Sequence, residues 1–213
     1  VNFGADWLEP GRILYGNRAA VAVGELDGRM SQRVRDVHAL LSIVEPDAVA
    51  TDNIWGYLWG KMGYGALLFC TALTPDSMSD AMARPEHRGV YEALGHEVMA
   101  LASAEGVKPL GFNGFDPDAF LRSDPDDMRV ALETMVAHNR KTAKTHSGIW
   151  RDLAVRKRRT EVDAQIGTMI PLAAAHGLEV PVLAKLVELI HAIEDGEKPQ
   201  SAARVDEMVS LCG

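Results

Sequence analysis

A single lysine, Lys61, lies in an apolar and glycine-rich segment that covers residues 54–69. The pattern predicts a long helix that is capped by Asp52 and runs to about Ala72. Each glycine inside a helix costs about 1 kcal/mol relative to alanine, so four of them indicate close approach of another backbone or of a ligand. A lysine partly withdrawn from water in such a place is suited to proton transfer. The alternative is a tightly packed helix whose lysine reaches solvent along its own methylene chain.

A second segment, residues 146–167, combines a hydroxyl, a carboxylate and a run of basic residues. Thr160 is typical of a helix N-cap, and Asp163 three residues later resembles a capping box for a helix over 160–176. This assignment places Glu161 in the first helical turn, where the helix dipole favours a carboxylate. The segment therefore provides a carboxylate that could interact with a basic group from elsewhere in the chain.

The basic run over residues 156–159 has several interpretations. It could bind nucleic acid, contact a nucleotide phosphate on a partner domain, or be a solvated loop that offsets an acidic protein. The formal net charge of −8 disfavours nucleic-acid binding, because such binding depends on neutralising phosphates. The seven histidines show no compact ligand spacing, so no metal site is predicted.

The elements that must position these residues change in character near residue 51. Before it, the pattern predicts a hairpin of strands 12–15 and 19–25, a helix from Ser31 to Val44, and a short strand over 48–51. After it, the pattern is helical throughout, with helices expected over 52–72, 86–104, 116–121, 125–144, 160–176, 182–194 and 202–211. The expected fold is mainly α, with a small α/β portion over 1–51 and an all-helical domain over 52–213.

Two separated segments together resemble the ketopantoate reductase family, also called 2-dehydropantoate 2-reductase. The first is Asp52-Asn53-Ile54 followed by Leu58-Trp59-Gly60-Lys61-Met62. The second is Ser147 with Arg151-Asp152-Leu153 and then Arg159-Thr160-Glu161-Val162-Asp163. The resemblance covers about residues 10–195 and implies a helical domain like that of 6-phosphogluconate dehydrogenase. Residues 1–51 would then be the last part of a Rossmann domain.

The resemblance also implies a chemistry, the reduction of a 2-keto acid with NADPH. Lys61 would donate the proton and polarise the ketone oxygen, and Glu161 would hold a substrate hydroxyl and orient Lys61. Ser147 would bind the substrate carboxylate, and Asn53 and His146 would complete the substrate site. No G-x-G-x-x-G sequence occurs, so residues 1–213 by themselves are not expected to form the NADPH site.

The sequence departs from the family pattern four and eight residues after the lysine. The family places asparagines there, and this chain has Gly65 and Phe69. This difference predicts a less polar substrate than ketopantoate. It also favours an alternative, a non-catalytic helical module for dimerisation or small-ligand binding.

The setting of the protein is predicted from composition. Two distant cysteines, Cys70 and Cys212, favour a reducing cytoplasm over a disulfide framework. No apolar run is long enough for a membrane span. A truncated Rossmann sheet would expose an edge strand, and such edges pair with other chains, so a homodimer is expected.

Overall fold

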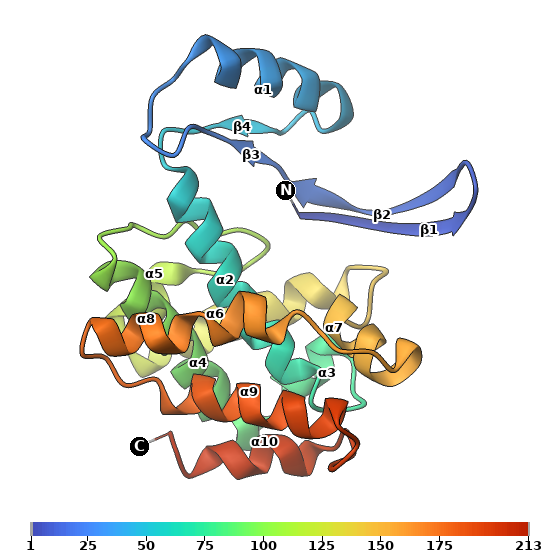
Figure 1. Ribbon diagram of the computed structural model, residues 1–213, viewed down its shortest axis with the longest axis vertical. Coiled ribbons are helices and arrows are strands. Elements are labelled where there is room, and N and C mark those ends of the chain that lie inside the picture. Colours follow the sequence, from blue (N-terminus) through green and yellow to red (C-terminus); the bar gives the residue numbers. More distant parts are fainter. Residues whose placement is uncertain (1, 213) are drawn as a thin grey trace.

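The computed structural model describes the backbone of residues 2–212 and the side chains of residues 8–13 and 20–212. A helical body forms one end of the molecule, and a small α/β portion with a long hairpin forms the other (Figure 1). Helix α2 (Ile54–Thr71) joins the two ends. The expected fold class, an all-helical domain preceded by a small α/β portion, is confirmed.

The α/β portion is a β–α–β unit with a hairpin in front of it. Strands β3 (Ala22–Val23) and β4 (Val49–Ala50) are parallel, and α1 (Gln32–Val44) connects them. Ser31 caps α1 as predicted, since its side chain accepts a hydrogen bond from the Val34 backbone N–H (3.2 Å). Val34 is the one buried residue of α1, so most of the apolar face of this helix is uncovered.

The predicted position of the hairpin turn is wrong. Strand β1 (Asn2–Glu9) pairs with β2 (Arg12–Ala20), and the turn lies at Pro10-Gly11, where Gly11 has a φ of +79°. The sequence Gly16-Asn17-Arg18, which separates the two expected strands and was expected to form the turn, lies inside β2 beside a shift in register. A bulge accommodates such residues within a strand, whereas the positive φ makes Gly11 the stronger turn residue.

The helical body contains the predicted helices with bounds that differ by a few residues, one of them interrupted, together with short elements over 78–82 and 148–156 that lie outside the predicted ranges. They are α3 (Met78–Met82), η1 (Pro85–His87), α4 (Arg88–Ala104), α5 (Pro117–Arg122), α6 (Pro125–Arg140), α7 (Gly148–Arg151), η2 (Asp152–Arg156), η3 (Asp163–Gly167), α8 (Met169–Ala175), α9 (Pro181–Glu194) and α10 (Ala202–Val209). The core lies between α2, α4, α6 and α9 and includes fully buried Tyr91, Leu94 and Leu186. Burial also raises the pKa of Cys70 to about 12, so its thiol stays protonated.

The helix predicted over 160–176 is interrupted. It divides into η3, a π-helical turn in which the Thr168 N–H donates to the Asp163 carbonyl (3.1 Å), and α8. Pro171 lacks an N–H and its ring clashes with the carbonyl four residues earlier, which is that of Gly167. The wider turn ahead of the proline avoids this conflict.

An extended segment, residues 108–110, lies directly against α2 and explains two of its glycines. The Leu110 N–H donates to the Gly56 carbonyl (2.9 Å). A Cβ at Gly56 would lie 2.6 Å from the Lys108 carbonyl oxygen, and one at Gly60 would lie 1.9 Å from that of Leu110. The predicted close approach of a second backbone to this helix is therefore confirmed.

A buried carboxylate caps α9 from another helix. Val180 precedes α9 and has no side-chain hydrogen bond to offer, so Glu97 of α4 accepts from the backbone N–H groups of Val182 (3.0 Å) and Leu183 (2.7 Å). Burial raises the pKa of Glu97, and these two hydrogen bonds act in the opposite direction. Nothing in the local sequence of α9 indicates this cap.

Replacing Gly60 tests the backbone contact. Gly60→Ala should lower the free energy of unfolding by about 1–3 kcal/mol, because the added methyl forces residues 108–110 away from α2. Chemical denaturation of the purified chain measures the change. Gly89→Ala, whose Cβ would meet only Cys212 Cβ at an ordinary 3.7 Å, is the matched control and should remain near wild type. Equal stability of the two variants would contradict the contact.

Replacing Glu97 tests the buried cap through its pH dependence. Because the pKa of Glu97 is higher in the folded chain than its ordinary value of 4.5, protonation favours folding. That contribution is complete below the ordinary pKa and is lost as the pH rises through the folded-state pKa. The stability advantage of wild type over Glu97→Gln should therefore shrink as the pH rises above the ordinary pKa of 4.5. Urea denaturation across this range measures it, and exposed Glu179→Gln is the control. An advantage that grows with pH would contradict the assignment.

Candidate functional site

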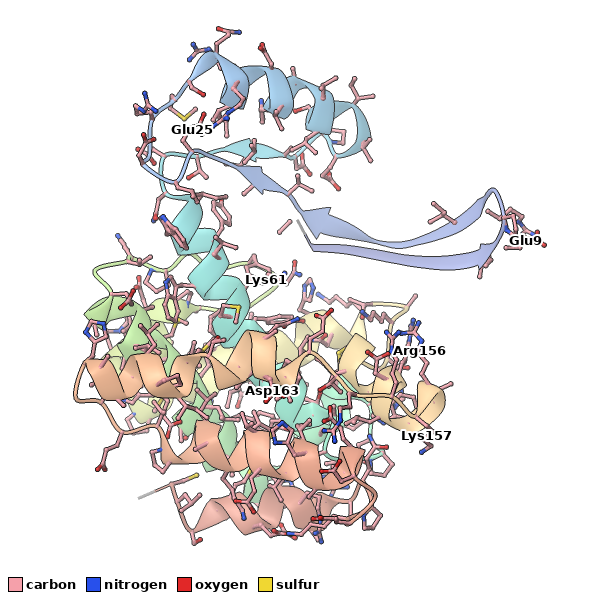
Figure 2. The ribbon with its side chains drawn as sticks, viewed as in Figure 1. Glu9, Glu25, Lys61, Arg156, Lys157 and Asp163 are labelled. Carbon is pink, nitrogen blue, oxygen red and sulfur yellow. The ribbon has the colours of Figure 1, made fainter. Side chains whose placement is uncertain are left out.

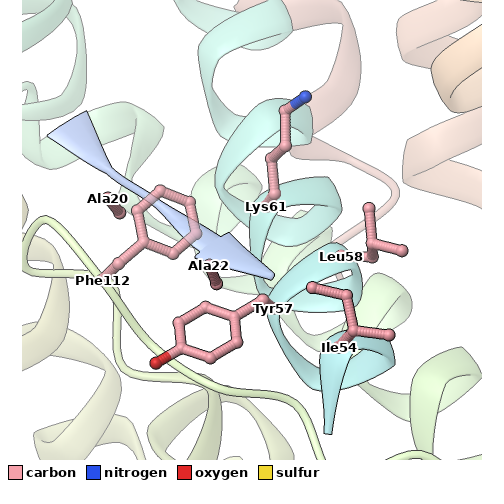
Figure 3. A pocket seen from close by; sticks show the side chains of 7 residues that line it. All are labelled: Ala20, Ala22, Ile54, Tyr57, Leu58, Lys61 and Phe112. Carbon is pink, nitrogen blue, oxygen red and sulfur yellow. The ribbon is translucent and has the colours of Figure 1, made fainter. Parts of the chain in front are cut away.

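Lys61 lies in a small hollow between α2 and the strand region that precedes β3 (Figure 3). The other lining residues are almost all apolar: Ala20, Ala22, Ile54, Tyr57, Leu58 and Phe112. Figure 3 shows the lysine ammonium extending away from the rings of Tyr57 and Phe112. The hollow measures about 50 Å³, whereas ligand pockets commonly exceed about 300 Å³. Among the described residues, this hollow is therefore too small to be a complete ligand pocket.

The Lys61 ammonium is free within the described part of the chain. Its side chain is exposed, so the expected withdrawal of this lysine from water is not found. No hydrogen bond or ion pair to another described residue holds it. An ammonium on an apolar surface, without an internal carboxylate partner, is available to a ligand with a negative or polarised oxygen.

A second and larger hollow of about 660 Å³ lies on the neighbouring face of α2. From α2 it is lined by Trp55, Leu58, Trp59 and Met62, and across from them by residues of η3 and α8, among them Gln165 and Met169. Leu58 lines both hollows, so they meet at this side chain. The surface of α2 that carries Lys61 is thus continuous with a broad apolar groove.

Glu161 does not share a hollow with Lys61 among the described residues. Its side chain is exposed at the start of η3 and accepts a hydrogen bond from the side-chain amide of Gln165. Gln165 in turn lines the larger hollow. Helix α2 packs against η3, but the predicted meeting of Lys61 and Glu161 in one cleft is not seen.

The capping box predicted at Thr160 forms only in part: the Thr160 hydroxyl oxygen accepts from the Val162 N–H (3.2 Å), as an N-cap does, but Asp163 does not complete the box. Thr160 donates from its backbone N–H (2.6 Å) and its hydroxyl (2.7 Å) to the carboxylate of Glu194 at the end of α9. The Asp163 carboxylate instead lies against the His191 ring, with 2.9 Å between Oδ1 and Nε2. A carboxylate from a distant helix therefore takes the place that the local sequence assigned to Asp163.

Ser147 and His146 lie at the start of α7. Ser147 is only 1% exposed, and its hydroxyl oxygen caps α7 by accepting from the Trp150 N–H (3.1 Å). The His146 ring lies 4.0 Å from the ring of Trp150, and its Nε2 is 3.3 Å from the Pro75 carbonyl oxygen. Both residues have structural contacts, and their roles toward a substrate stay predictions.

Asn53 is the N-cap of α2, the position that the sequence assigned to Asp52. Its side-chain oxygen accepts from the Gly56 N–H (2.9 Å), and its amide nitrogen donates to the Lys108 carbonyl (2.9 Å). The side chain fixes the start of the helix that carries Lys61. A direct contact of Asn53 with substrate stays a prediction.

The two departures from the family pattern have different surroundings. Phe69 is fully buried in the core. A Cβ at Gly65 would meet nothing within 4 Å. Only Gly65 therefore alters the surface near Lys61.

The basic run at 156–159 is largely neutralised by nearby acids. Arg156 and Arg158 both reach Asp152 (2.8 and 2.9 Å), and Arg159 pairs with Asp195 (2.5 Å). Partial burial of Asp152 opposes ionisation, but hydrogen bonds from the two arginines hold its pKa below the ordinary value. Figure 2 places Arg156 and Lys157 at the edge of the helical body, apart from Lys61 on α2. This pattern is typical of a solvated loop.

The described residues also exclude two kinds of feature. They contain no cluster of three or more His, Cys, Asp and Glu side chains placed to share a metal ion. None of the helices described is both long enough and apolar enough to span a bilayer.

Several solved structures share the fold. A ketopantoate reductase of the PanE/ApbA family from Ralstonia eutropha superposes with a TM-score of 0.69 at 22% identity, over 92% of this chain and 58% of that one. D-mandelate dehydrogenase in complex with NADH and anilino(oxo)acetate superposes with a TM-score of 0.71 at 20% identity, over 91% of this chain and 58% of that one. The fold is therefore shared with a part of each of these two proteins.

The family itself follows from sequence. Residues 53–194 match the model of the ketopantoate reductase PanE/ApbA C-terminal domain, and the chain belongs to this family. A 2-dehydropantoate 2-reductase from Archaeoglobus fulgidus is 26% identical over 195 residues, which are 91% of this chain and 59% of that protein. The chain thus spans little more than half the length of these relatives.

Residues around Lys61 were missed by the sequence analysis. Tyr57 and Leu58 carry no distinct signal within an apolar helix, and Phe112 comes from a loop far along the chain. Only the fold brings Phe112 to Lys61, so no spacing rule would have found it.

Removing the Ser147 hydroxyl tests its capping role. Ser147→Ala should lower the free energy of unfolding by about 1 kcal/mol, the usual cost of losing an N-cap. Thermal or chemical denaturation measures it, with exposed Ser210→Ala as the control, expected within about 0.5 kcal/mol of wild type. A Ser147→Ala variant as stable as the control would show that the cap contributes nothing.

Proposed function

We propose that this chain forms the substrate side of a nicotinamide-dependent reductase of 2-keto acids, with Lys61 as the proton donor. The observation that carries the proposal is the exposed Lys61 ammonium on an apolar face of α2, which has no hydrogen-bond or ion-pair partner among the residues whose side chains are described. The lysine lies inside the part of the chain that matches the ketopantoate reductase C-terminal family. The family relationship and the site chemistry support the same reaction class.

The chemistry follows from the charge of Lys61. When a hydride adds to the carbonyl carbon of a 2-keto acid, negative charge develops on the carbonyl oxygen. An ammonium held beside that oxygen stabilises the charge and then transfers a proton to it, which leaves a 2-hydroxy acid. The apolar residues around Lys61 strengthen this interaction once a bound substrate has displaced water from the exposed ammonium.

The remaining site residues have supporting roles in the proposal. Glu161, two residues before η3, orients Lys61 or holds a substrate hydroxyl, and Gln165 of η3, which donates a hydrogen bond to Glu161, lines the larger hollow. Ser147 and His146 bind the substrate carboxylate from α7, which packs against α2. Asn53 sets the start of α2 and contacts the substrate from that end. Substrate binding must draw Glu161 toward Lys61 for this arrangement to operate.

The described residues do not fit a dinucleotide. The turn between β3 and α1 presents Glu25 at the start of α1, where a pyrophosphate would otherwise bind. Hydrogen bonds from Arg33 hold the pKa of Glu25 below its ordinary value, so this carboxylate is charged and repels phosphate. In the proposed reaction, the hydride comes from a reduced nicotinamide, which is NADPH by family resemblance. Residues other than those of this turn bind that nicotinamide.

The exposed apolar surface of the α/β portion agrees with the assignment of nicotinamide binding and substrate binding to different parts of the protein. Leu40, Ile43 and Val44 of α1 are 65, 79 and 66% exposed, and the parallel pair β3–β4 is too small to be stable alone. We assign residues 1–51 to a remnant of a dinucleotide-binding domain and residues 52–213 to the helical substrate domain. The same exposed surfaces are consistent with a homodimer, which also remains a proposal.

A second candidate function is a non-catalytic module that binds a small apolar ligand. The large hollow beside Trp55, Trp59 and Met62 favours it, because its size suits a ligand and it needs no lysine. In this reading Lys61 has no role, so one substitution distinguishes the two candidates.

Replacing Lys61 tests the reductase. The full polypeptide encoded by the gene that contains this sequence is assayed for NADPH and NADH oxidation with a panel of 2-keto acids. Lys61→Ala should lower kcat by about 100-fold or more, because it removes both the proton donor and the charge opposite the developing alkoxide. Lys141→Ala, which removes an exposed lysine at the end of α6, is the control and should retain full activity.

Two outcomes would decide against the proposal. Turnover that is unchanged in Lys61→Ala would remove Lys61 from the mechanism. No turnover with any keto acid and either nicotinamide, in a protein that is folded by circular dichroism, would favour the non-catalytic module.

A further inference from the structure

A third hollow lies on the helical body, apart from the two beside Lys61. It measures about 610 Å³, which is within the usual range of ligand pockets, about 300–1,000 Å³. Residues 150–158, from α7 through η2 to the loop after it, supply one part of the lining, and residues 193–200, from the end of α9 onward, supply most of the rest. Within the described part of the chain, this hollow shares no lining residue with the two beside α2.

The charges around this third hollow favour an anion. Its lining contains three cations, Lys157, Arg158 and Lys198, and one carboxylate, that of Glu194. The Glu194 side chain is only 2% exposed, and its oxygens already accept hydrogen bonds from Thr160 and from the basic run over 156–159. The carboxylate therefore contributes little toward a ligand, and the cations determine the sign of the charge that the hollow attracts.

Lys157 is the lining cation that has no acidic partner. Arg158 pairs with Asp152 (2.9 Å), and Lys198 pairs with Glu207 (2.6 Å). No hydrogen bond or ion pair engages the Lys157 ammonium among the residues whose side chains are described. Its three N–H donors are therefore available to a negatively charged group in the hollow.

The backbone of Lys157 is unfavourable for a residue with a side chain. Lys157 follows the π-helical turn η2 and adopts the left-handed region, with φ +51° and ψ +49°. This conformation costs about 1–2 kcal/mol, and burial of the side chain does not offset the cost, because Lys157 is exposed. Backbone strain and π-helical turns both occur often at ligand sites. The position of Lys157 thus agrees with a binding role.

The apolar part of the lining determines what else the ligand must carry. Leu153 is 4% exposed and belongs to the core, and Trp150 and Ile193 pack against that core. The Trp150 indole N–H is buried and has no acceptor among the described residues, although buried donors are normally paired. A ligand with an apolar chain and acceptor oxygens would satisfy both kinds of lining group.

We propose that this hollow is a binding site for a small organic anion with an apolar body, namely a carboxylate on an aliphatic chain. Lys157 pairs with the carboxylate, and Trp150, Leu153 and Ile193 contact the chain. The site is separate from Lys61 and does not depend on the proposed reductase activity.

The experiment measures binding of octanoate to the full polypeptide by isothermal titration calorimetry. Lys157→Gln, which removes the charge and keeps much of the side-chain length, should raise the Kd for octanoate about tenfold, because it removes a charge-assisted hydrogen bond. Lys157→Arg, which keeps the charge, should stay within about twofold of wild type. Lys141→Gln is the matched control at an exposed lysine outside the hollow and should not change the Kd.

Two further probes separate the contributions of charge and chain. Octan-1-ol has the chain without the charge, so it should bind more weakly than octanoate and equally to wild type and Lys157→Gln. Acetate has the charge without the chain and should bind at least tenfold more weakly than octanoate. Octan-1-ol binding as tightly as octanoate, or acetate binding as tightly, would contradict the proposed ligand class.

A spectroscopic signal locates the bound octanoate. The indole N–H resonance of Trp150, identified by its loss in Trp150→Phe, should shift in the ¹⁵N–¹H spectrum of wild type as octanoate is added. That shift, together with the weaker binding of Lys157→Gln, supports the proposal. No measurable binding of octanoate, an unchanged Kd in Lys157→Gln, or binding that is lost in Lys61→Ala would overturn it. None of these measurements requires turnover, so the proposed function can fail while this site stands.

Discussion

The contact between α2 and the extended segment 108–110 is the constraint on which the rest of the site depends. It requires two glycines, Gly56 and Gly60, and it is closed at its start by the double hydrogen bond of Asn53. Because this contact fixes one face of the helix, it also fixes the direction of the opposite ridge. Leu58 and Lys61 lie on that ridge, and Phe112, two residues after the extended segment, completes the small hollow around the lysine.

The helical body supports this ridge by long-range polar contacts that replace local ones. Glu97 of α4 caps α9, and Glu194 at the end of α9 accepts from Thr160 just before η3. Each contact satisfies backbone N–H groups that are normally satisfied by a side chain close in sequence. These contacts therefore hold different helices together. The position of η3 opposite α2 follows from these ties, and with it the shape of the larger groove.

The two ends of the molecule differ in how fully they bury their apolar side chains. The helical body has a continuous buried core, whereas the β3–α1–β4 unit exposes much of the apolar face of α1. The hollow beside Lys61 lies at their junction, with the packed helical body on one side and the exposed unit on the other. In the proposed reductase, the small volume beside Lys61 and the separation of Glu161 from it agree with a site that closes when substrate binds.

Apart from the family resemblance, which rests on matching motifs, the sequence by itself determined the fold class, the longer helices of the body, the change near residue 51 and the place of Lys61 in a glycine-rich helix. These depend on periodicity, caps and spacing, which are local properties of the chain. Only the tertiary structure decided which glycines pack against a backbone, that Phe69 is core and Gly65 is open, and that Glu194 displaces Asp163 at Thr160. It also showed that Ser147 caps a helix and that Lys61 is exposed. The physical reason is that these features depend on groups far apart along the chain, and their distances are set by the packing of whole helices.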